Sequence, residues 1–180
     1  MIEREVKLPI QDVTAIRAAL EAAGWACTRP PYPESNTLYD TPGQDLLRAG
    51  KMLRVREVPG RVVLTVKLAP LEAGPHKARE EHEAELAEMG GLQAILQALD
   101  LQPAWRYEKR RSRYEREGEA GVIELDETPV GDFLELEGEA DWIDRTAAAL
   151  GFSPADYITA SYRRLFVDAR GEDGGDMVFA

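Results

Sequence analysis

The sequence contains one cysteine and two histidines, and this scarcity excludes several kinds of site. Cys27 has no second cysteine to pair with, so an internal disulfide and a zinc site built on paired thiolates are both excluded. His76 and His82 have no further His or Cys nearby at ligand spacing, and we interpret both as surface or loop residues. We expect Cys27 itself to be a small, buried or half-buried side chain.

Long apolar runs and an excess of positive charge are also missing. No stretch approaches the roughly 18 consecutive apolar residues of a membrane-spanning helix, and the opening residues MIEREVK lack the basic-then-apolar order of a secretory signal. The net charge of −11 repels nucleic acid and anionic lipid at long range. We therefore expect a cytoplasmic protein that binds neither nucleic acid nor membrane.

The length and composition favour one domain with a substantial core. Of the 180 residues, 44% are hydrophobic, and neither internal repeats nor low-complexity linkers divide the chain. We predict one domain over residues 1–170 and a mobile C-terminal tail over 171–180, although the apolar residues at the end of the tail could dock on the domain. A monomer or a homodimer is expected.

Four stretches predict amphipathic helices, with apolar residues at helical spacing. GLQAILQALDL places Leu92, Ile95, Leu96 and Leu99 in one apolar stripe, and VTAIRAALEAAG, DWIDRTAAALG and SPADYITASYRRLF are the other three stretches. Proline and glycine mark the connections between elements. TRPPYPES predicts a rigid polar connection, PG at positions 59–60 predicts a hairpin turn, and LAPLEAGPHK predicts a loop.

The segments that predict strands share an alternation of charged and aliphatic residues. In the opening stretch, period-two spacing puts Glu3, Glu5 and Lys7 on one face of a strand and sends Val6 and Leu8 to the other face. MLRVREV, RVVLTVKL, AREEHEAEL, RYEKRRSRYE, GVIELDE and DFLELEGE repeat this pattern. Seven or so strands are thus aliphatic on one side and ionised on the other.

This alternation predicts a curled sheet with its charged face inside. An open antiparallel sheet can also turn a polar face to water. Here, however, some strands carry only basic residues on that face and others carry paired carboxylates, while the amphipathic helices need an aliphatic surface to pack on. Because burying so many ions without water would be prohibitive, we predict an α+β fold, a closed or nearly closed antiparallel β-barrel around a hydrophilic tunnel, with the helices packed outside.

Such a tunnel has walls of two chemical kinds. Basic side chains donate to phosphate oxygens, and carboxylates are the hard oxygen ligands that Mg²⁺ or Mn²⁺ prefers. A polyphosphate that carries a metal ion needs both, because Mg²⁺ is usually shared between one or two carboxylates and phosphate oxygens. The basic set is Lys7, Arg54, Arg56, Lys67, Arg79, Lys109 and Arg111, and the acidic set is Glu3, Glu5, Glu81, Glu83, Glu124, Asp126, Glu135 and Glu137.

The same residues resemble, in order, the motifs of the CYTH superfamily, also called triphosphate tunnel metalloenzymes, which includes thiamine triphosphatases, inorganic tripolyphosphatases and class IV adenylate cyclases. Glu3-x-Glu5-x-Lys7 is similar to the opening signature of the family. NTLYDTP, LRVR, LTVK, REEHEAEL, EKRRSRY, IELDE, FLELEGE and ASYRRL resemble its later segments. The resemblance covers nearly the whole chain, and it implies an eight-stranded antiparallel tunnel that holds a triphosphate and one or two divalent cations.

The expected roles of these residues follow from phosphate chemistry and from the resemblance. Displacement at phosphate needs charge neutralisation and in-line geometry more than a covalent nucleophile, so we assign the basic set to positioning the triphosphate. By resemblance, the leading metal ligands are Glu3, Glu5, Asp126, Glu135 and Glu137, whereas Glu81, Glu83 and Glu124 could equally pair with Arg79 or Lys109.

Two residues are candidates for the proton-transfer step. Neighbouring charges in a basic cavity could lower the pKa of Lys67 toward the range useful for proton transfer. Tyr39 could cooperate with Lys67 in positioning water, or it could be an aromatic packing residue before a turn.

The sequence thus leads to a metal-dependent hydrolase that removes phosphate from inorganic tripolyphosphate or from an organic triphosphate such as thiamine triphosphate. One alternative is an adenylate cyclase, in which the 3′-hydroxyl of ATP attacks the α-phosphate and pyrophosphate leaves. The other is a polyphosphate- or nucleotide-binding module without catalysis. Paired carboxylates argue against simple anion capture, because they weaken it unless a metal ion is present.

Overall fold

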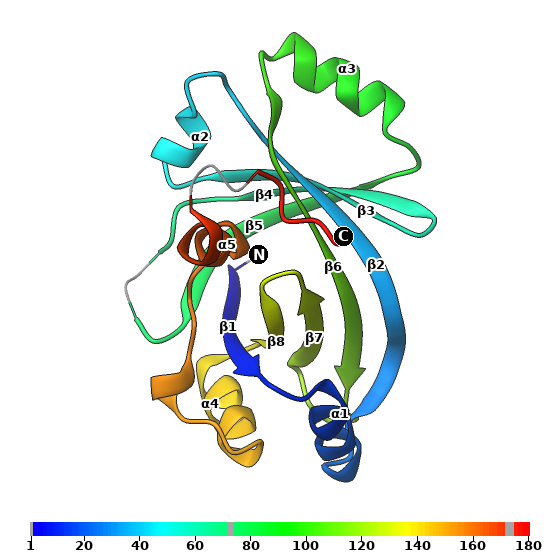
Figure 1. Cartoon of the computed structure of the whole chain (residues 1–180), viewed down its shortest axis with the longest axis vertical. Coiled ribbons are helices and arrows are strands. Elements are labelled where there is room, and N and C mark those ends of the chain that lie inside the picture. Colours follow the sequence, from blue (N-terminus) through cyan, green and yellow to red (C-terminus); the bar gives the residue numbers. More distant parts are fainter. Residues whose placement is uncertain (1, 72–73, 172–174) are drawn as a thin grey trace.

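A closed antiparallel β-barrel forms the centre of the molecule (Figure 1) in the computed structural model, which describes residues 2–71, 74–171 and 175–180. In this part of the chain, eight strands follow the order β1-β5-β4-β3-β2-β6-β7-β8 around the barrel, and β8 pairs with β1. The closed eight-stranded barrel confirms the predicted fold class. The strands are β1 (Ile2–Ile10), β2 (Ala26–Asp40), β3 (Met52–Val58), β4 (Arg61–Lys67), β5 (Lys77–Leu86), β6 (Gln102–Glu115), β7 (Val122–Thr128) and β8 (Gly131–Glu137).

The helices all lie outside the barrel. In Figure 1, α1 and α4 lie at its lower end, α2 and α3 at its upper end, and α5 beside β1. Among the described residues, no helix is long and apolar enough to cross a membrane. The helices are α1 (Val13–Ala22), α2 (Asp45–Arg48), α3 (Gly90–Ala98), α4 (Ala140–Ala149) and α5 (Tyr162–Arg170), and a short 3₁₀ turn, η1 (Pro154–Asp156), precedes α5.

The main apolar core lies between the barrel wall and two of these helices. Val6 of β1 and Leu134 and Leu136 of β8 point outward and are buried against Leu20 of α1 and Ile143 of α4. Their aliphatic surface leaves water when the helices pack on the barrel, which is the main favourable term in folding. The outward direction of the aliphatic residues on these strands is therefore confirmed.

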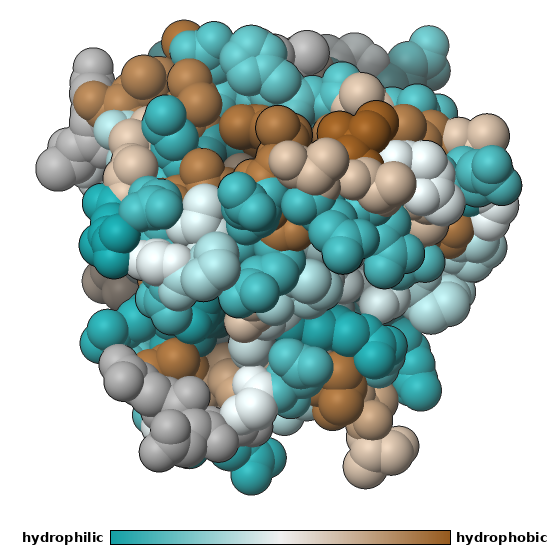
Figure 2. Space-filling view, turned by 90° about the horizontal axis from the view of Figure 1, so that it is seen from above, coloured by the Kyte–Doolittle hydropathy of each residue, from teal (hydrophilic) through white to brown (hydrophobic). Residues whose placement is uncertain are grey.

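A second core lies under α3, and it is narrower than the sequence predicts. Leu92 and Leu96 pack with Leu53 of β3, but the side chains of Ile95 and Leu99 are exposed. Leu99 is the C-cap residue, and Asp100, which follows it, has a left-handed backbone conformation with φ of 58°. The view from the end that carries α2 and α3 shows apolar surface interspersed with hydrophilic residues (Figure 2).

The proline-rich segment TRPPYPES belongs to strand β2, so the prediction of a connection there is wrong. In the described structure, residues 26–34 of β2 pair with β6, whereas β3 joins the other edge of β2 only from Ser35 onward. A proline on an unpaired edge removes no ladder hydrogen bond. Register shifts follow Cys27 and Arg29. Cys27 lies on this edge and is exposed, which corrects the expectation that it is buried.

The stretch SPADYITASYRRLF forms two short elements instead of the single helix that its spacing predicts. Asp156 and Ser153 close the η1 turn with reciprocal hydrogen bonds, and the backbone of Ile158 then pairs with Lys7 of β1. Helix α5 begins afresh after Ser161, whose hydroxyl accepts a hydrogen bond from the backbone N–H of Arg164. This strand-like contact between the two elements excludes a continuous helix.

The end of the chain contacts strand β6. Met177 is fully buried, and its backbone N–H and C=O pair with residues 106 and 108 of β6. The indole N–H of Trp105 donates to the carbonyl oxygen of Gly175 at 3.0 Å. These contacts agree with docking of the last apolar residues, while residues 172–174 of the expected tail lie outside the described residues.

Tight packing around Trp142 of α4 generates a test of this arrangement. A Cβ built on Gly121 would overlap the indole ring of Trp142, whereas a Cβ on Gly91 meets nothing within 4 Å. We predict that Gly121→Ala lowers the free energy of unfolding by about 1–3 kcal/mol through overpacking. Chemical denaturation should detect this loss, and Gly91→Ala, the control, should be neutral or slightly stabilising. An unchanged midpoint for Gly121→Ala would contradict this packing.

Candidate functional site

The barrel encloses a cavity of about 410 Å³ lined largely by ionised side chains. They come from every strand except β2, and helix α5 covers one side. The predicted convergence of charged faces around a hollow is therefore present. The predicted residues that line it are Glu3, Glu5, Lys7, Arg54, Arg56, Lys67, Arg79, Glu81, Glu83, Lys109, Arg111, Glu124, Glu135 and Glu137.

Strand register places acidic and basic residues directly opposite one another on neighbouring strands of the cavity wall. Lys7 of β1 lies opposite Glu135 of β8, and its ammonium group is 3.0 Å from the carboxylate. Lys67 of β4 lies opposite Glu81 of β5, also at 3.0 Å. Directly opposed residues on neighbouring strands are close enough for such pairs. The cavity wall is thus an ion-pair network before any ligand is bound.

Asp126 is a centre of this network and does not line the cavity. Its carboxylate accepts hydrogen bonds from Lys109 at 2.8 Å, from Arg111 at 2.6 and 2.7 Å, and from the hydroxyl of Tyr162 at 2.6 Å. The residue is fully buried. These bonds make Asp126 the centre of an internal ion-pair network, and its role as a metal ligand stays a prediction from the resemblance.

Arg111 is similarly engaged by acidic neighbours. Its guanidinium forms ion pairs with Glu124, Asp126 and Glu135, and these carboxylates raise its pKa although burial acts in the opposite direction. Arg111 lines the cavity as predicted, but its donors already have partners. It is therefore better suited to holding the carboxylates in place than to gripping a phosphate group by itself.

Lys67 differs from its prediction in the direction of its pKa shift. Burial acts to lower the pKa, but the carboxylates of Glu5, Glu3 and Glu81 outweigh burial and raise it. The direction of this shift is opposite to the lowered pKa that was expected, and the role of Lys67 in proton transfer stays a prediction. The environment of Lys67 is acidic, because β1 and β5 place their glutamates around its ammonium group. Lys67 is a fixed positive charge in the cavity.

Tyr39 lies on the outer face of β2 and does not line the cavity. It is buried with Leu53 and Val55 in the core under α3, and its cross-strand partner is Leu53. Of its two proposed roles, the packing role agrees with this position. The catalytic role does not, because the tyrosine has the opposite side-chain direction from the cavity-facing residues of the neighbouring strand.

Two carboxylates in the cavity have raised pKa values. Burial, together with the neighbouring charges of Glu124 and Glu3, raises the pKa of Glu137 to about 7. Burial and a hydrogen bond with Glu3 raise the pKa of Glu81 to about 8, despite the nearby Lys67. Within the described residues, Glu137 takes part in no ion pair. These glutamates form an acidic side of the cavity where added positive charge would be stabilising.

The acidic side fits a divalent cation in its chemistry but is not a complete metal cage. Carboxylate oxygens are the ligands that Mg²⁺ and Mn²⁺ prefer. Among the residues that the structure describes, no three acidic, His or Cys side chains converge to hold a metal ion alone. Mg²⁺ commonly takes only one or two carboxylates and completes its shell with water and phosphate oxygens. The donor set therefore fits a cation that is shared with a phosphate ligand.

Within the described part of the chain, one cation in the cavity has no acidic partner. Among the described residues, Arg79 forms no ion pair within 4 Å, and its buried Nε has no hydrogen-bond partner. Arg54 and Arg56, by contrast, approach Glu83 at 3.6 and 2.8 Å. An unpaired guanidinium facing a cavity is suited to a ligand with phosphate oxygens.

Sequence reasoning missed several residues of the interior. Glu34 of β2 is 2% exposed, and Lys109 and Arg111 outweigh its burial and lower its pKa to about 2. It was missed because TRPPYPES was interpreted as a connection. Lys77 has the same period-two spacing as Arg79, which would have identified it. The remaining residues that line the cavity are Tyr107 and Arg113 of β6, Ser161 and Tyr162 at the start of α5, and Met52 of β3.

The two histidines agree with their interpretation as surface or loop residues. His82 is exposed, and His76 contacts Asp144 at 2.8 Å beside α4. Trp25 and Trp142 pack edge to face, with ring centroids 5.9 Å apart. The charged cavity is therefore the candidate functional site.

Comparisons with known proteins identify a family that this chain matches. The family model of the CYTH domain matches residues 1–162, and no curated protein matches the sequence. A Vibrio parahaemolyticus structure, named as that of a candidate adenylate cyclase, has a TM-score of 0.80 at 21% identity and covers 92% of this chain and 98% of its own. A Pyrococcus horikoshii protein has a TM-score of 0.77 at 24% identity, with 93% and 99% covered.

A plant structure adds an activity to these similarities. The Hippeastrum protein, named as a candidate adenylyl cyclase with a dominant triphosphatase activity, has a TM-score of 0.66 at 20% identity and covers 93% of this chain and 96% of its own. At such identities the likeness of the solved structures concerns the fold. The family match spans most of the sequence, and the chain therefore belongs to the CYTH domain family, whose members are triphosphatases or adenylate cyclases.

Proposed function

We propose that this chain is a divalent-cation-dependent hydrolase that removes phosphate from a triphosphate bound in the barrel cavity. The observation that carries this proposal is that one cavity holds the cation Arg79 and the carboxylate Glu137, neither of which forms an ion pair among the described residues. A polyphosphate complements the first and a divalent cation complements the second. A metal–triphosphate complex satisfies both at once.

The charge balance of the interior supports a requirement for metal. Among the described residues, nine basic side chains and seven carboxylates line the cavity, and Glu34 and Asp126 lie buried behind them. If all are ionised, the formal charges cancel. A triphosphate carries several negative charges, so an interior without net positive charge needs added cations to hold it. Divalent cations supply that charge next to the phosphate groups.

In the proposed mechanism, the residues of this chain bind and orient the phosphate chain. Arg79, Arg56 and Arg54 grip non-bridging oxygens, and the ammonium group of Lys67 stabilises charge as it moves onto the leaving group. Glu3, Glu5, Glu81 and Glu137 would hold Mg²⁺ or Mn²⁺. When bound, the cation supplies charge neutralisation at phosphate and lowers the pKa of a coordinated water.

Adenylate cyclase activity is the alternative function, and the name of the Vibrio parahaemolyticus neighbour favours it. The two reactions share the need to hold a triphosphate with metal. They differ in the nucleophile, because the cyclase uses the 3′-hydroxyl of its own substrate and must hold the ribose against the α-phosphate. The products therefore separate them.

The proposed function is tested by a product assay. We expect the purified protein to release phosphate from tripolyphosphate, thiamine triphosphate or a nucleoside triphosphate when Mg²⁺ or Mn²⁺ is present, and to stop when the cation is chelated. Phosphate, pyrophosphate and cyclic AMP should be resolved by chromatography. Cyclic AMP and pyrophosphate from ATP would establish the cyclase instead, and metal-dependent binding without turnover would establish a binding module.

Substitution of Arg79 should separate a role in ligand binding from a role in folding. Because Arg79 has no acidic partner among the described residues, Arg79→Ala should leave the free energy of unfolding unchanged or slightly higher. Its KM for the triphosphate should rise by about tenfold or more, since a charge-assisted bond to phosphate is lost. Arg110→Ala is the control, because Arg110 is exposed on the outer face of β6. Wild-type KM in Arg79→Ala would remove Arg79 from the binding site.

Removing the charge of Glu137 and removing the charge of Asp126 should have different effects on the free energy of unfolding. Glu137→Gln removes an incompletely neutralised carboxylate, so the metal-free protein should not lose stability, while the Mg²⁺ concentration for half-maximal activity should rise. Asp126→Asn breaks a buried ion pair and should lower the free energy of unfolding by about 3 kcal/mol. Denaturation without metal and a metal titration of activity measure the two effects. A lower stability for Glu137→Gln, with unchanged metal dependence, would identify Glu137 as a structural ion-pair residue.

A further inference from the structure

A second cavity of about 150 Å³ adjoins the charged cavity. The two share five lining residues, so a ligand can extend from one into the other. The second cavity lies between the end of β2, helix α2, the start of β3 and helix α5. The shared residues are Met52, Arg79, Tyr107, Ser161 and Tyr162.

The walls of the second cavity are mainly apolar and aromatic. Leu46 of α2 and Leu53 of β3 line one part, and Trp105 and Tyr107 of β6 line another. The rings of Trp105 and Tyr107 are stacked, with centroids 5.2 Å apart and planes 23° from parallel. Apolar and aromatic surface of this kind suits a flat ring and offers little to a phosphate chain.

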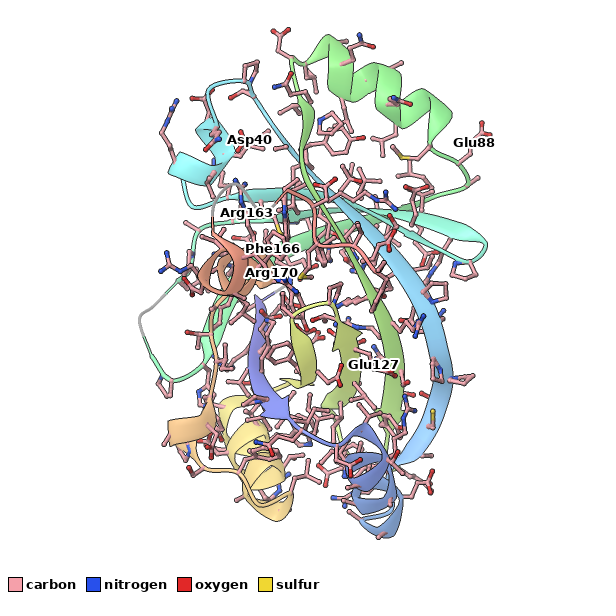
Figure 3. The ribbon with its side chains drawn as sticks, viewed as in Figure 1. Asp40, Glu88, Glu127, Arg163, Phe166 and Arg170 are labelled. Atoms are coloured by element: carbon pink, nitrogen blue, oxygen red, sulfur yellow. The ribbon has the colours of Figure 1, made fainter. Side chains whose placement is uncertain are left out.

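In the described part of the chain, three basic side chains and one carboxylate line the second cavity. Lys51, Arg79 and Arg163 line it, and none of the three takes part in an ion pair among the described residues. The acidic residue in its wall is Asp40, whose carboxylate accepts hydrogen bonds from three backbone N–H groups at 2.8 to 2.9 Å. Figure 3 labels Asp40 at the end of β2 and Arg163 on α5. The cavity therefore disfavours a cationic ring such as a thiazolium.

Size restricts the occupant further. A cavity of about 150 Å³ accommodates one benzene-sized ring. A pyrimidine ring meets that limit, whereas a purine is larger. The shared residues between the cavities would then contact the part of the ligand that joins the ring to the phosphates.

We propose that the second cavity binds the base of a pyrimidine nucleoside triphosphate, whose phosphate chain occupies the charged cavity; this inference rests on the function proposed above. The ring lies against Trp105, the ribose lies at the junction beside Met52 and Ser161, and Arg79 contacts the phosphate nearest the ribose. The preferred substrate is thus an organic triphosphate with a neutral, single-ring base.

Substrate comparison tests this directly. The kcat/KM values for UTP, ATP, thiamine triphosphate and tripolyphosphate are measured with Mg²⁺ under one set of conditions. We expect UTP to exceed the other three by about tenfold or more, the discrimination that pocket contacts of this size supply. A preference for ATP would overturn the single-ring limit, a preference for thiamine triphosphate would overturn the charge argument, and equal or faster turnover of tripolyphosphate would overturn the site as a whole.

Variants confined to the second cavity provide the second test. Ala104 lines this cavity and not the charged one, so Ala104→Phe should fill it, lowering kcat/KM for UTP to the value for tripolyphosphate without changing the latter. Arg163→Gln should raise KM for UTP alone. Arg164→Gln is the matched control, because the adjacent Arg164 pairs with Asp168 on the exposed side of α5. Equal effects of Ala104→Phe on UTP and tripolyphosphate would overturn the proposal.

A binding measurement tests the base site separately from the proposed hydrolysis. Calorimetric titration with UTP and with tripolyphosphate, each with Mg²⁺, reports affinity without requiring turnover. Tighter binding of UTP than of tripolyphosphate, lost in Ala104→Phe, supports the base site even if no phosphate is released, in which case the proposed hydrolysis alone fails. Equal binding of the two, with phosphate released from both, refutes the base site and leaves the hydrolase intact.

Discussion

Pairing of buried charge is the interaction on which this barrel depends. An ionised group taken out of water without a partner costs several kcal/mol, and the interior holds many such groups. The centre of the network is Asp126, which accepts from Lys109, Arg111 and Tyr162 while fully buried. Because Tyr162 begins α5, this one carboxylate links strands β6 and β7 to the helix that covers the cavity. The charged interior is therefore part of what holds the fold together.

Some charged side chains of this network have several ion-pair partners and others have few. This difference determines which ligands the cavity can bind. Arg111 and Lys109 have several acidic partners each, whereas Arg79 has none among the described residues and Glu137 has only partial compensation. A cation and a carboxylate that fail to pair in the same cavity leave room for a ligand with both kinds of charge. A metal–phosphate complex is such a ligand, and simple anion binding would leave the acidic side unsatisfied.

The same alternation of residues builds the site and the core. Val6 and Leu8 of β1 are buried outward beneath helices, while Glu5 and Lys7, between and beside them, face the cavity. A shift of one residue in register would exchange the two sets and place charge in the apolar core. We therefore expect substitutions on either face of these strands to be poorly tolerated. Helices contribute less to the charged site, but α2 and α5 shape the apolar cavity beside it.

The sequence by itself determined the closed fold and the direction of its charged faces, because period two is a property of any extended chain and holds whatever the neighbours are. Period two alone puts Glu3, Glu5 and Lys7 on one face, and the inward direction of that face followed from the helices, which need the aliphatic face to pack on. The strand at TRPPYPES could not be read locally, because its prolines are tolerated only by an edge that pairing leaves free. Likewise, only the tertiary structure shows that Lys67 lies among carboxylates and that the carboxylate of Asp126 forms ion pairs with Lys109 and Arg111. Both depend on which residues lie opposite across the barrel, and strand order and register are set by long-range packing.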